Sequence, residues 1–230
     1  MKRLFLLITL TFIALGASAQ KDVTKFLGIP VDGYKSEMRK ALMAKGYVPK
    51  TYNGTEYFEG EFNGRDVHIY IVTNNNKVYR IMVSEKNTVD EGEIKIKFNN
   101  LVYQFMNSDR YFYDREKDQI IPENEDISYE MLVHNKKYDA NFYQMIDETK
   151  IDTLAIQQEA IKKLRQKFTE EEIASGNEDV QLEAQKIALT IGVEKLFSKS
   201  VWFRICEFEG EYYLTIYYDN EYNAAKGEDL

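Results

Sequence analysis

Residues 56–85 constrain the fold more than any other stretch, because they hold three apolar runs separated by two short turns. The first turn is Asn63-Gly64, which favours a type I′ hairpin since both residues accept positive φ. Asparagines at residues 74–76 form the second turn, and Asn also tolerates the left-handed region. In the middle run apolar residues alternate with mixed and aromatic ones, as in a strand with one buried face. The stretch therefore predicts a three-stranded antiparallel meander.

The start of the chain has the three parts of a signal peptide. A basic beginning is followed by an apolar run over residues 4–15 and by an Ala-Ser-Ala motif that ends at residue 19. A membrane anchor is the alternative, but the run is shorter than the about 20 residues that a spanning helix needs. We therefore expect residues 1–19 to be removed and the mature chain to be exported, to the periplasm or the cell exterior, with no membrane span.

The net charge limits the classes of partner, and the cysteine content limits the kinds of site that the chain can form. Removing Lys2 and Arg3 leaves 28 basic and 38 acidic side chains, a net charge of −10. An acidic chain with no basic cluster argues against nucleic acid and against anionic membrane surfaces as partners. Cys206 is the only cysteine, so neither a disulfide within the chain nor a site with several cysteine ligands can form. We expect this thiol to be buried in the apolar run around it.

The remaining elements follow from periodicity and from capping residues. We expect a helix from Asp32 to Gly46, then the meander, and then a helix from a Thr88 capping box to residue 107. Further along come a hairpin (residues 127–134 and 137–145), helices over residues 152–197 broken at Gly176-Asn177, and a final hairpin (residues 201–208 and 211–218). The order α-βββ-α-ββ-αα-ββ predicts an α+β fold, with an antiparallel meander and hairpins packed against helices.

Two points of this assignment stay open. Residues 93–98 alternate strictly between charged and apolar side chains, so that a strand explains them as well as the preferred helix does. Residues 20–230 are expected to form a single α+β domain, and a division into two subdomains near residues 109–126 is the alternative.

Three segments together resemble a known group of proteins. They are residues 26–33 (FLGIPVDG), residues 126–130 (DISYE) and the C-terminal region, with residues 217–223 (YYDNEYN) and 227–230 (GEDL). The chain resembles uncharacterised secreted proteins of gut Bacteroidota, and this implies an envelope or secreted location without any activity. The opening helix and meander also resemble the architecture of β-lactamase-inhibitor-protein-like folds, which says nothing of function.

Motifs that carry chemistry are missing from the sequence. It has no GxSxG, HExxH, P-loop or GxGxxG motif, and we expect no cofactor. The two histidines, His68 and His134, both fall on predicted strands, where they could form a pair only if those strands are neighbours.

An acidic loop could bind a metal ion. Asp114, Glu116, Asp118 and Glu125 match positions 1, 3, 5 and 12 of a calcium loop. However, Gln119 stands where such a loop requires glycine. A solvated acidic loop is therefore the alternative.

Tyrosine is the strongest remaining signal, with 17 residues that often neighbour another aromatic residue. Adjacent residues of a strand face opposite sides, so one ring of each pair can fill the core while the other binds a ligand. Aromatic packing across strands is the alternative. The candidate binding residues are Tyr70, Tyr111, Tyr113, Tyr143, Tyr213 and Tyr218.

Two hypotheses about function follow. The first is a non-catalytic binding module of the cell envelope, which uses an aromatic sheet face to bind an envelope protein or a glycan. The second is an envelope hydrolase with paired carboxylates, for which Asp219, Glu221 and the loop over residues 114–126 are candidates.

Overall fold

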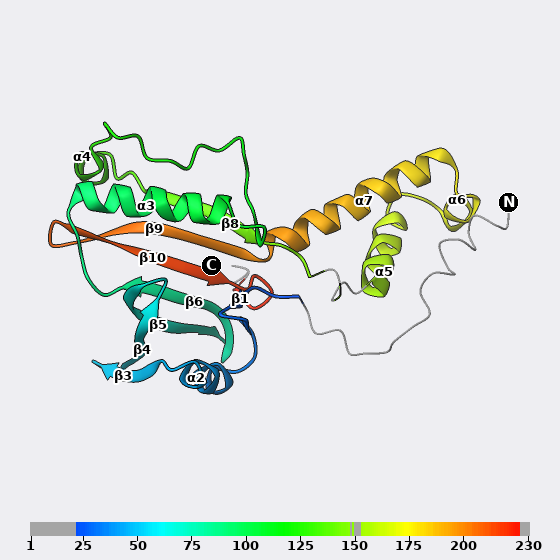
Figure 1. The fold of residues 1–230 in the computed structure, drawn as a ribbon. Helices are drawn as coiled ribbons and strands as arrows, with labels where there is room; N and C mark the ends of the chain where they lie inside the picture. Colours follow the sequence, from blue (N-terminus) through cyan, green and yellow to red (C-terminus); the bar gives the residue numbers. More distant parts are fainter. Residues whose placement is uncertain (1–21, 148, 150–152, 226–230) are drawn as a thin grey trace.

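The computed structural model describes residues 22–147, 149 and 153–225, and it has an α+β fold (Figure 1). Eight strands form one antiparallel sheet in the order β3-β4-β5-β6-β10-β9-β8-β7, and β1 and β2 form a separate hairpin. The strands are β1 (Lys25–Phe26), β2 (Ile29–Pro30), β3 (Val48–Tyr52), β4 (Thr55–Phe62), β5 (Arg65–Asn74), β6 (Lys77–Glu85), β7 (Tyr111–Phe112), β8 (Asp139–Gln144), β9 (Ser200–Phe208) and β10 (Glu211–Asp219). The helices are α2 (Lys35–Ala44), α3 (Glu91–Met106), α4 (Ile127–Val133), α5 (Thr153–Leu164), α6 (Glu170–Ser175) and α7 (Glu178–Phe197).

The predicted meander is present as β4, β5 and β6, and one more strand extends it. Asn63 and Gly64 have φ of 53° and 74°, as the expected turn requires. The additional strand, β3, reaches β4 through Asn53-Gly54, a second Asn-Gly turn whose residues also have positive φ. Pro49 is tolerated in β3 because this strand lies at the edge of the sheet.

One hydrophobic core lies between the sheet and two helices. Helix α2 packs on β5 and β6, whereas α3 packs on β10, β9 and β7. Side chains from both helices belong to the same buried cluster, which includes Met38 and Leu42 of α2 and Ile94 and Phe98 of α3. This core joins residues on both sides of the segment 109–126, where a division was considered.

Helix α3 resolves the ambiguity over residues 93–98, which are helical. The side chain of Asp90 caps the helix by accepting the Glu93 backbone N–H at 2.8 Å, so the expected capping role of Thr88 is wrong. Thr88 instead donates its hydroxyl to Glu211. The helix buries an apolar stripe that comprises Ile94, Phe98, Leu101, Val102 and Phe105.

Residues 127–134 were expected to form a strand, and this prediction is wrong, because residues 127–133 form helix α4. Asp126 caps the helix by accepting the Tyr129 N–H at 2.8 Å. The carboxylate of Glu91, at the start of α3, accepts a second N–H from the first turn of α4, that of Ile127, at 3.1 Å. Burial raises the pKa of the Glu91 carboxyl, but the hydrogen bonds from Ser128 and Ile127 outweigh it and hold this pKa below its usual value.

Because residues 127–133 are helical, β8 has other neighbours in the sheet than the prediction gave it. Strand β8 now pairs with β9 on one side and with the short edge strand β7 on the other, rather than with residues 127–134. His134 consequently lies at the C-terminal end of α4 and not on a strand.

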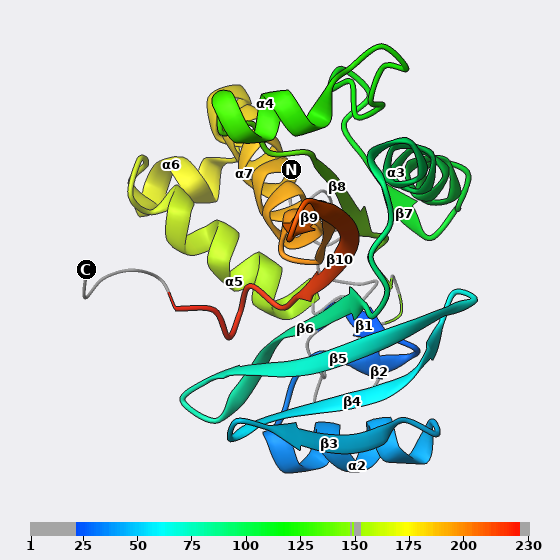
Figure 2. The same cartoon turned by 90° about the vertical axis from the view of Figure 1, so that its left-hand side faces the viewer.

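Helices α5, α6 and α7, here called the helical arm, project from one end of the sheet (Figures 1 and 2). The predicted break is confirmed, since Gly176 has φ of 60° and Asn177 caps α7 by accepting the Val180 N–H at 2.9 Å. The single helix expected before this break is wrong, because α5 ends at Leu164 and α6 begins at Glu170. The arm has its own small core around Leu164, Ile187 and Ile191. Among the described residues no helix is long and apolar enough to cross a membrane. The predicted signal peptide lies outside the described residues.

Replacing Ile191 by Ala should loosen the helical arm without affecting the sheet. Ile191 is buried in a cluster separate from the main core, so we expect a local cost of about 2 kcal/mol. Hydrogen exchange should become faster in α5 and α7 and stay unchanged in β9 and β10. Leu189→Ala on the same helix is the control, because Leu189 is 71% exposed. Equal exchange in the two variants would contradict a separate arm core.

Candidate functional site

The sheet face opposite α2 and α3, here called the open face, carries a mixed set of aromatic and charged side chains. Its side chains alternate with the core residues along β5, β6, β8 and β9, as the pleat requires. Most of its members are half-buried. They include Tyr57, His68, Tyr70, Arg80, Met82, Asp139, Asn141, Tyr143, Trp202, Arg204, Cys206, Tyr213 and Tyr217.

Cross-strand register places several of these side chains in one row. Tyr70 pairs with Met82, Met82 with Tyr217, and Tyr217 with Trp202. Tyr57 of β4 continues the row, since its ring centroid lies 5.9 Å from that of Tyr70. The row therefore crosses β4, β5, β6, β10 and β9 without interruption, and residues far apart in the sequence form it.

The centre of the row is a pair of stacked rings with two guanidinium groups beside it. The rings of Trp202 and Tyr217 are nearly parallel, with centroids 4.0 Å apart and 15° between their planes. The guanidinium carbon of Arg204 lies 4.8 Å from the Trp202 centroid. That of Arg80 lies 5.0 Å from the Tyr217 centroid and 5.4 Å from the Trp202 centroid, at the edge of both rings. These distances suit cation–π attraction. We call Arg80, Tyr217, Trp202 and Arg204 the cation–aromatic stack.

Two aspartates hold the cation–aromatic stack in place. Asp219 accepts from Nε of Arg80 at 2.6 Å and from a terminal nitrogen at 2.7 Å, and it also accepts the Trp202 ring N–H at 2.9 Å. Asp139 binds Arg204 in the same two-pronged way, at 2.8 and 3.0 Å. The hydrogen bonds that Arg80 donates to Asp219 raise the pKa of Arg80, so this guanidinium stays charged. The stack is thus pre-organised.

Four tyrosines of the open face, Tyr70, Tyr143, Tyr213 and Tyr217, are neutral at physiological pH. Burial is the main cause that raises the pKa of Tyr70, Tyr143, Tyr213 and Tyr217. Each ring therefore offers an apolar surface together with a hydroxyl that can donate a hydrogen bond.

The structure divides the six candidate tyrosines into two groups. Tyr70, Tyr143 and Tyr213 lie on the open face and are half-buried. By contrast, Tyr218 is only 5% exposed, and its ring packs 5.0 Å from that of Phe26 in the core. The prediction of Tyr218 as a binding residue is wrong. Tyr217 and Tyr218 are adjacent on β10, and the alternation of side chains places Tyr217 on the open face.

Tyr111 and Tyr113 also pack on the core side. The Tyr111 ring lies 4.5 Å from Phe105, and the Tyr113 ring lies 5.9 Å from Phe142. Neither residue belongs to the open face. The side chains that sequence reasoning missed are Trp202, Arg80 and Arg204, although the alternation over residues 201–208 could have indicated the two on β9.

The four acidic residues proposed for a metal site do not form one. Asp114 and Asp118 accept backbone N–H groups of their own loop, at 3.0 Å each. Glu125 accepts from the side chains of Lys136 and Tyr138. Within the residues that the structure describes, no three acidic, histidine or cysteine side chains gather as metal ligands.

The candidates for acid–base or nucleophilic chemistry are mostly engaged elsewhere. Both oxygens of Asp219 bind the cation–aromatic stack. Burial, followed by the charge of Asp219, raises the pKa of Glu221. His134 lies 2.9 Å from Glu130, and His68 lies 3.5 Å from Glu59 on the open face. The thiol of Cys206 is half-buried rather than buried, and its Sγ lies 3.6 Å from Thr215.

Comparison of the chain with protein-family models, with curated proteins and with solved structures found no match in any of the three. The resemblance to secreted Bacteroidota proteins and to β-lactamase-inhibitor-protein-like folds therefore stays a prediction. Any account of function has to come from the geometry of the chain itself.

Proposed function

We propose that this chain is a non-catalytic binding module that recognises another protein through its open face. The observation that carries the proposal is the cation–aromatic stack in the middle of a half-exposed aromatic row. Trp, Tyr and Arg are the residue types that contribute most binding energy in protein interfaces. Here they are held rigidly before any partner arrives, which lowers the entropic cost of association.

A protein suits this surface better than a glycan. Sugars stack on the free face of an aromatic ring, but Trp202 and Tyr217 cover one face of each other. Arg204 lies over Trp202, whereas Arg80 lies beside both rings, 5.0 Å from the Tyr217 centroid and 5.4 Å from the Trp202 centroid. The stack therefore presents ring edges and guanidinium groups, which fit the apolar side chains and carbonyl oxygens of a protein surface.

The partner should be a protein of the cell envelope. This part of the proposal is supported by the predicted signal peptide at residues 1–19 and by the resemblance to secreted proteins. The hydrolase alternative is supported less well, because Asp219 is committed to Arg80 and Trp202.

A pair of double variants tests the proposal. Tyr70→Ala with Tyr213→Ala removes two rings from the open face, whereas Tyr103→Ala with Tyr129→Ala removes two exposed rings elsewhere. The mature chain, tagged at its C-terminus, would be crosslinked in intact envelopes and the captured protein would then be purified for a direct titration. We expect the open-face variant to bind this protein at least about tenfold more weakly and the control variant to bind normally.

Two outcomes would count against the proposal. Equal affinity of both double variants for the purified partner would place the interface outside the open face. Capture of no stoichiometric protein, together with saturable binding of an oligosaccharide that the open-face variant loses, would replace the protein partner by a glycan.

A further inference from the structure

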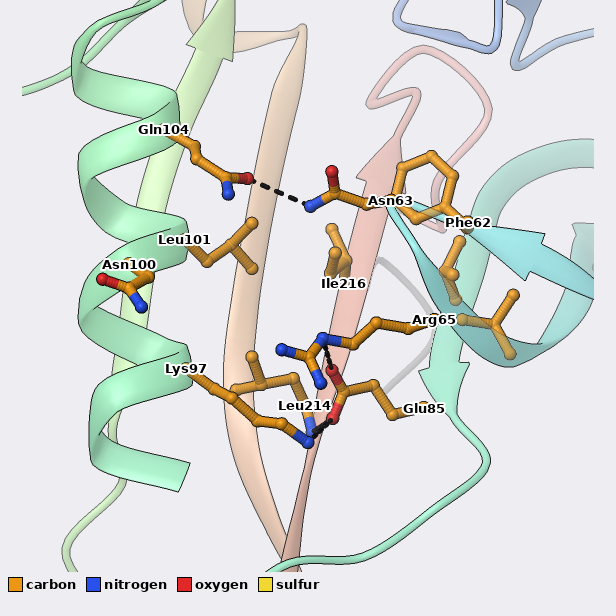
Figure 3. Close-up of a pocket in the computed structure, with 12 residues that line it drawn as sticks. Phe62, Asn63, Arg65, Glu85, Lys97, Asn100, Leu101, Gln104, Leu214 and Ile216 are labelled. Atoms are coloured by element: carbon orange, nitrogen blue, oxygen red, sulfur yellow. Dashed lines mark hydrogen bonds and ion pairs between the residues drawn. The ribbon is translucent and has the colours of Figure 1, made fainter. Parts of the chain in front are cut away.

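The core side of the sheet contains a cavity that the proposed function does not use. It has a volume of about 140 Å³ and lies between α3 and strands β4, β5, β6 and β10 (Figure 3). At one end the Asn63 side-chain amide donates to Gln104 at 3.0 Å, which links the β4–β5 turn to α3. Its apolar walls are Phe62, Val67, Val83, Leu101, Leu214 and Ile216.

Three charged side chains line the opposite end of the cavity. Lys97 Nζ lies 3.4 Å from Oε2 of Glu85, and Arg65 Nε lies 3.3 Å from Oε1 of the same carboxylate (Figure 3). The side chain of Lys97 is only 7% exposed and that of Glu85 is 11% exposed. A second cavity of about 190 Å³ shares these three residues, so they stand between an apolar chamber and a polar one.

Lys97 and Arg65 together have more N–H donors than the carboxylate of Glu85 can accept. Both contacts are longer than the about 2.7–3.2 Å of a good N–H···O hydrogen bond. An ammonium has three N–H groups and a guanidinium has five, and a single carboxylate cannot use them all. Glu93 approaches Lys97 at 3.6 Å, but its side chain is mostly exposed and its charge is screened by solvent.

The mostly buried cation at this end of the cavity is Lys97, because the Arg65 side chain is 47% exposed. An ammonium has three N–H groups, and the contact of Lys97 with Glu85 at 3.4 Å leaves donors for the carboxylate of a ligand.

We propose that this cavity binds a small monocarboxylic acid with an apolar body. The carboxylate accepts hydrogen bonds from Lys97 and Arg65, and the body fills the chamber beside Leu101 and Ile216. A dry cavity of about 150 Å³ holds a molecule the size of benzene, so the buried body has about six non-hydrogen atoms. The site is separate from the open face, because its strand residues point to the opposite side of the sheet.

Methyl NMR titration of the full mature chain tests this site. Hexanoate supplies both the charge and the body, hexan-1-ol supplies the body alone, and acetate supplies the charge alone. We expect hexanoate to shift the methyl signals of Leu101, Leu214 and Ile216 saturably, and those of Ile187 and Ile191 in the helical arm to stay unchanged. Its affinity should exceed that of either analogue by at least about tenfold.

Two variants assign the roles of the lining residues. Lys97→Met keeps the apolar stem and removes the charge, so hexanoate should bind at least about tenfold more weakly while hexan-1-ol is unaffected. Asn100→Trp starts from an exposed position on α3 that lines the cavity, so it should exclude hexanoate without disturbing the core.

The proposal is overturned if hexanoate gives no saturable shifts, if it binds no better than hexan-1-ol, or if both variants bind it like the unmodified chain. If Lys97→Met fails to fold, Asn100→Trp decides alone, and unchanged hexanoate binding in that variant would rule out the cavity.

Discussion

Replacing Phe203 by Ala is expected to lower the free energy of unfolding by about 3–5 kcal/mol, the range for deleting a large buried ring. Phe203 is fully buried on β9. Its ring centroid lies 5.1 Å from that of Phe98 on α3 and 6.0 Å from that of Phe142 on β8. The variant therefore removes the ring that joins the helix layer to the sheet, and neighbouring rings cannot collapse fully into the space.

Urea unfolding would measure this effect. The free energy of unfolding should depend on urea concentration with the same slope in the variant and in the unmodified chain. Phe208→Ala is the control, because Phe208 lies on the same strand but is 59% exposed, and it should change stability by less than about 0.5 kcal/mol. Comparable losses in the two variants would mean that β9 does not face the core as described.

Replacing Asp219 by Ala should cost about 2–4 kcal/mol, because it removes one partner of a mostly buried ion pair. The Asp219 side chain is only 7% exposed. Without it the Arg80 guanidinium loses both of its short hydrogen bonds, and the Trp202 ring N–H loses its acceptor. An unpaired charge and an unpaired donor would then remain in a partly desolvated place.

Asp139→Ala is the matched control for this experiment. It breaks the same two-pronged geometry with Arg204, but both of those side chains are more exposed, so we expect a loss of about 1 kcal/mol or less. Unfolding followed by far-ultraviolet circular dichroism would measure both values. Equal losses would show that burial of Asp219 does not contribute as argued.

Sequence reasoning was reliable where local chemistry decides the structure. The Asn63-Gly64 turn, the helix over residues 93–98 and the break at Gly176-Asn177 each depend on residues close together in the chain, and all three are confirmed. The fold class followed from the order of these local signals.

Reasoning from sequence failed where distant residues decide the structure. Residues 127–134 alternate like a strand, yet Glu91, 36 positions earlier, accepts the Ile127 N–H and helps to start a helix. Strand β3 was not predicted, although Asn53-Gly54 joins it to β4 in the same way as Asn63-Gly64 joins β4 to β5. The cation–aromatic stack could not be predicted either, since it needs the β6–β10 and β10–β9 registers.

Choosing between the members of an aromatic pair also requires the register. Tyr213 and Tyr143 were identified as outward residues, whereas Tyr218 was chosen where Tyr217 faces outward. Each pair offers two equivalent rings, and only the pairing of β10 with β6 and β9 says which of them meets α3.

The most direct test of the binding proposal uses Trp202, the only tryptophan of the chain, which lies in the cation–aromatic stack. Acrylamide quenching of its fluorescence would be measured for the free chain and for its complex with the purified, tryptophan-free partner captured from envelopes. Coverage of the open face predicts a quenching constant several-fold lower in the complex. An unchanged constant at saturating partner would show that the partner binds elsewhere and would contradict the account.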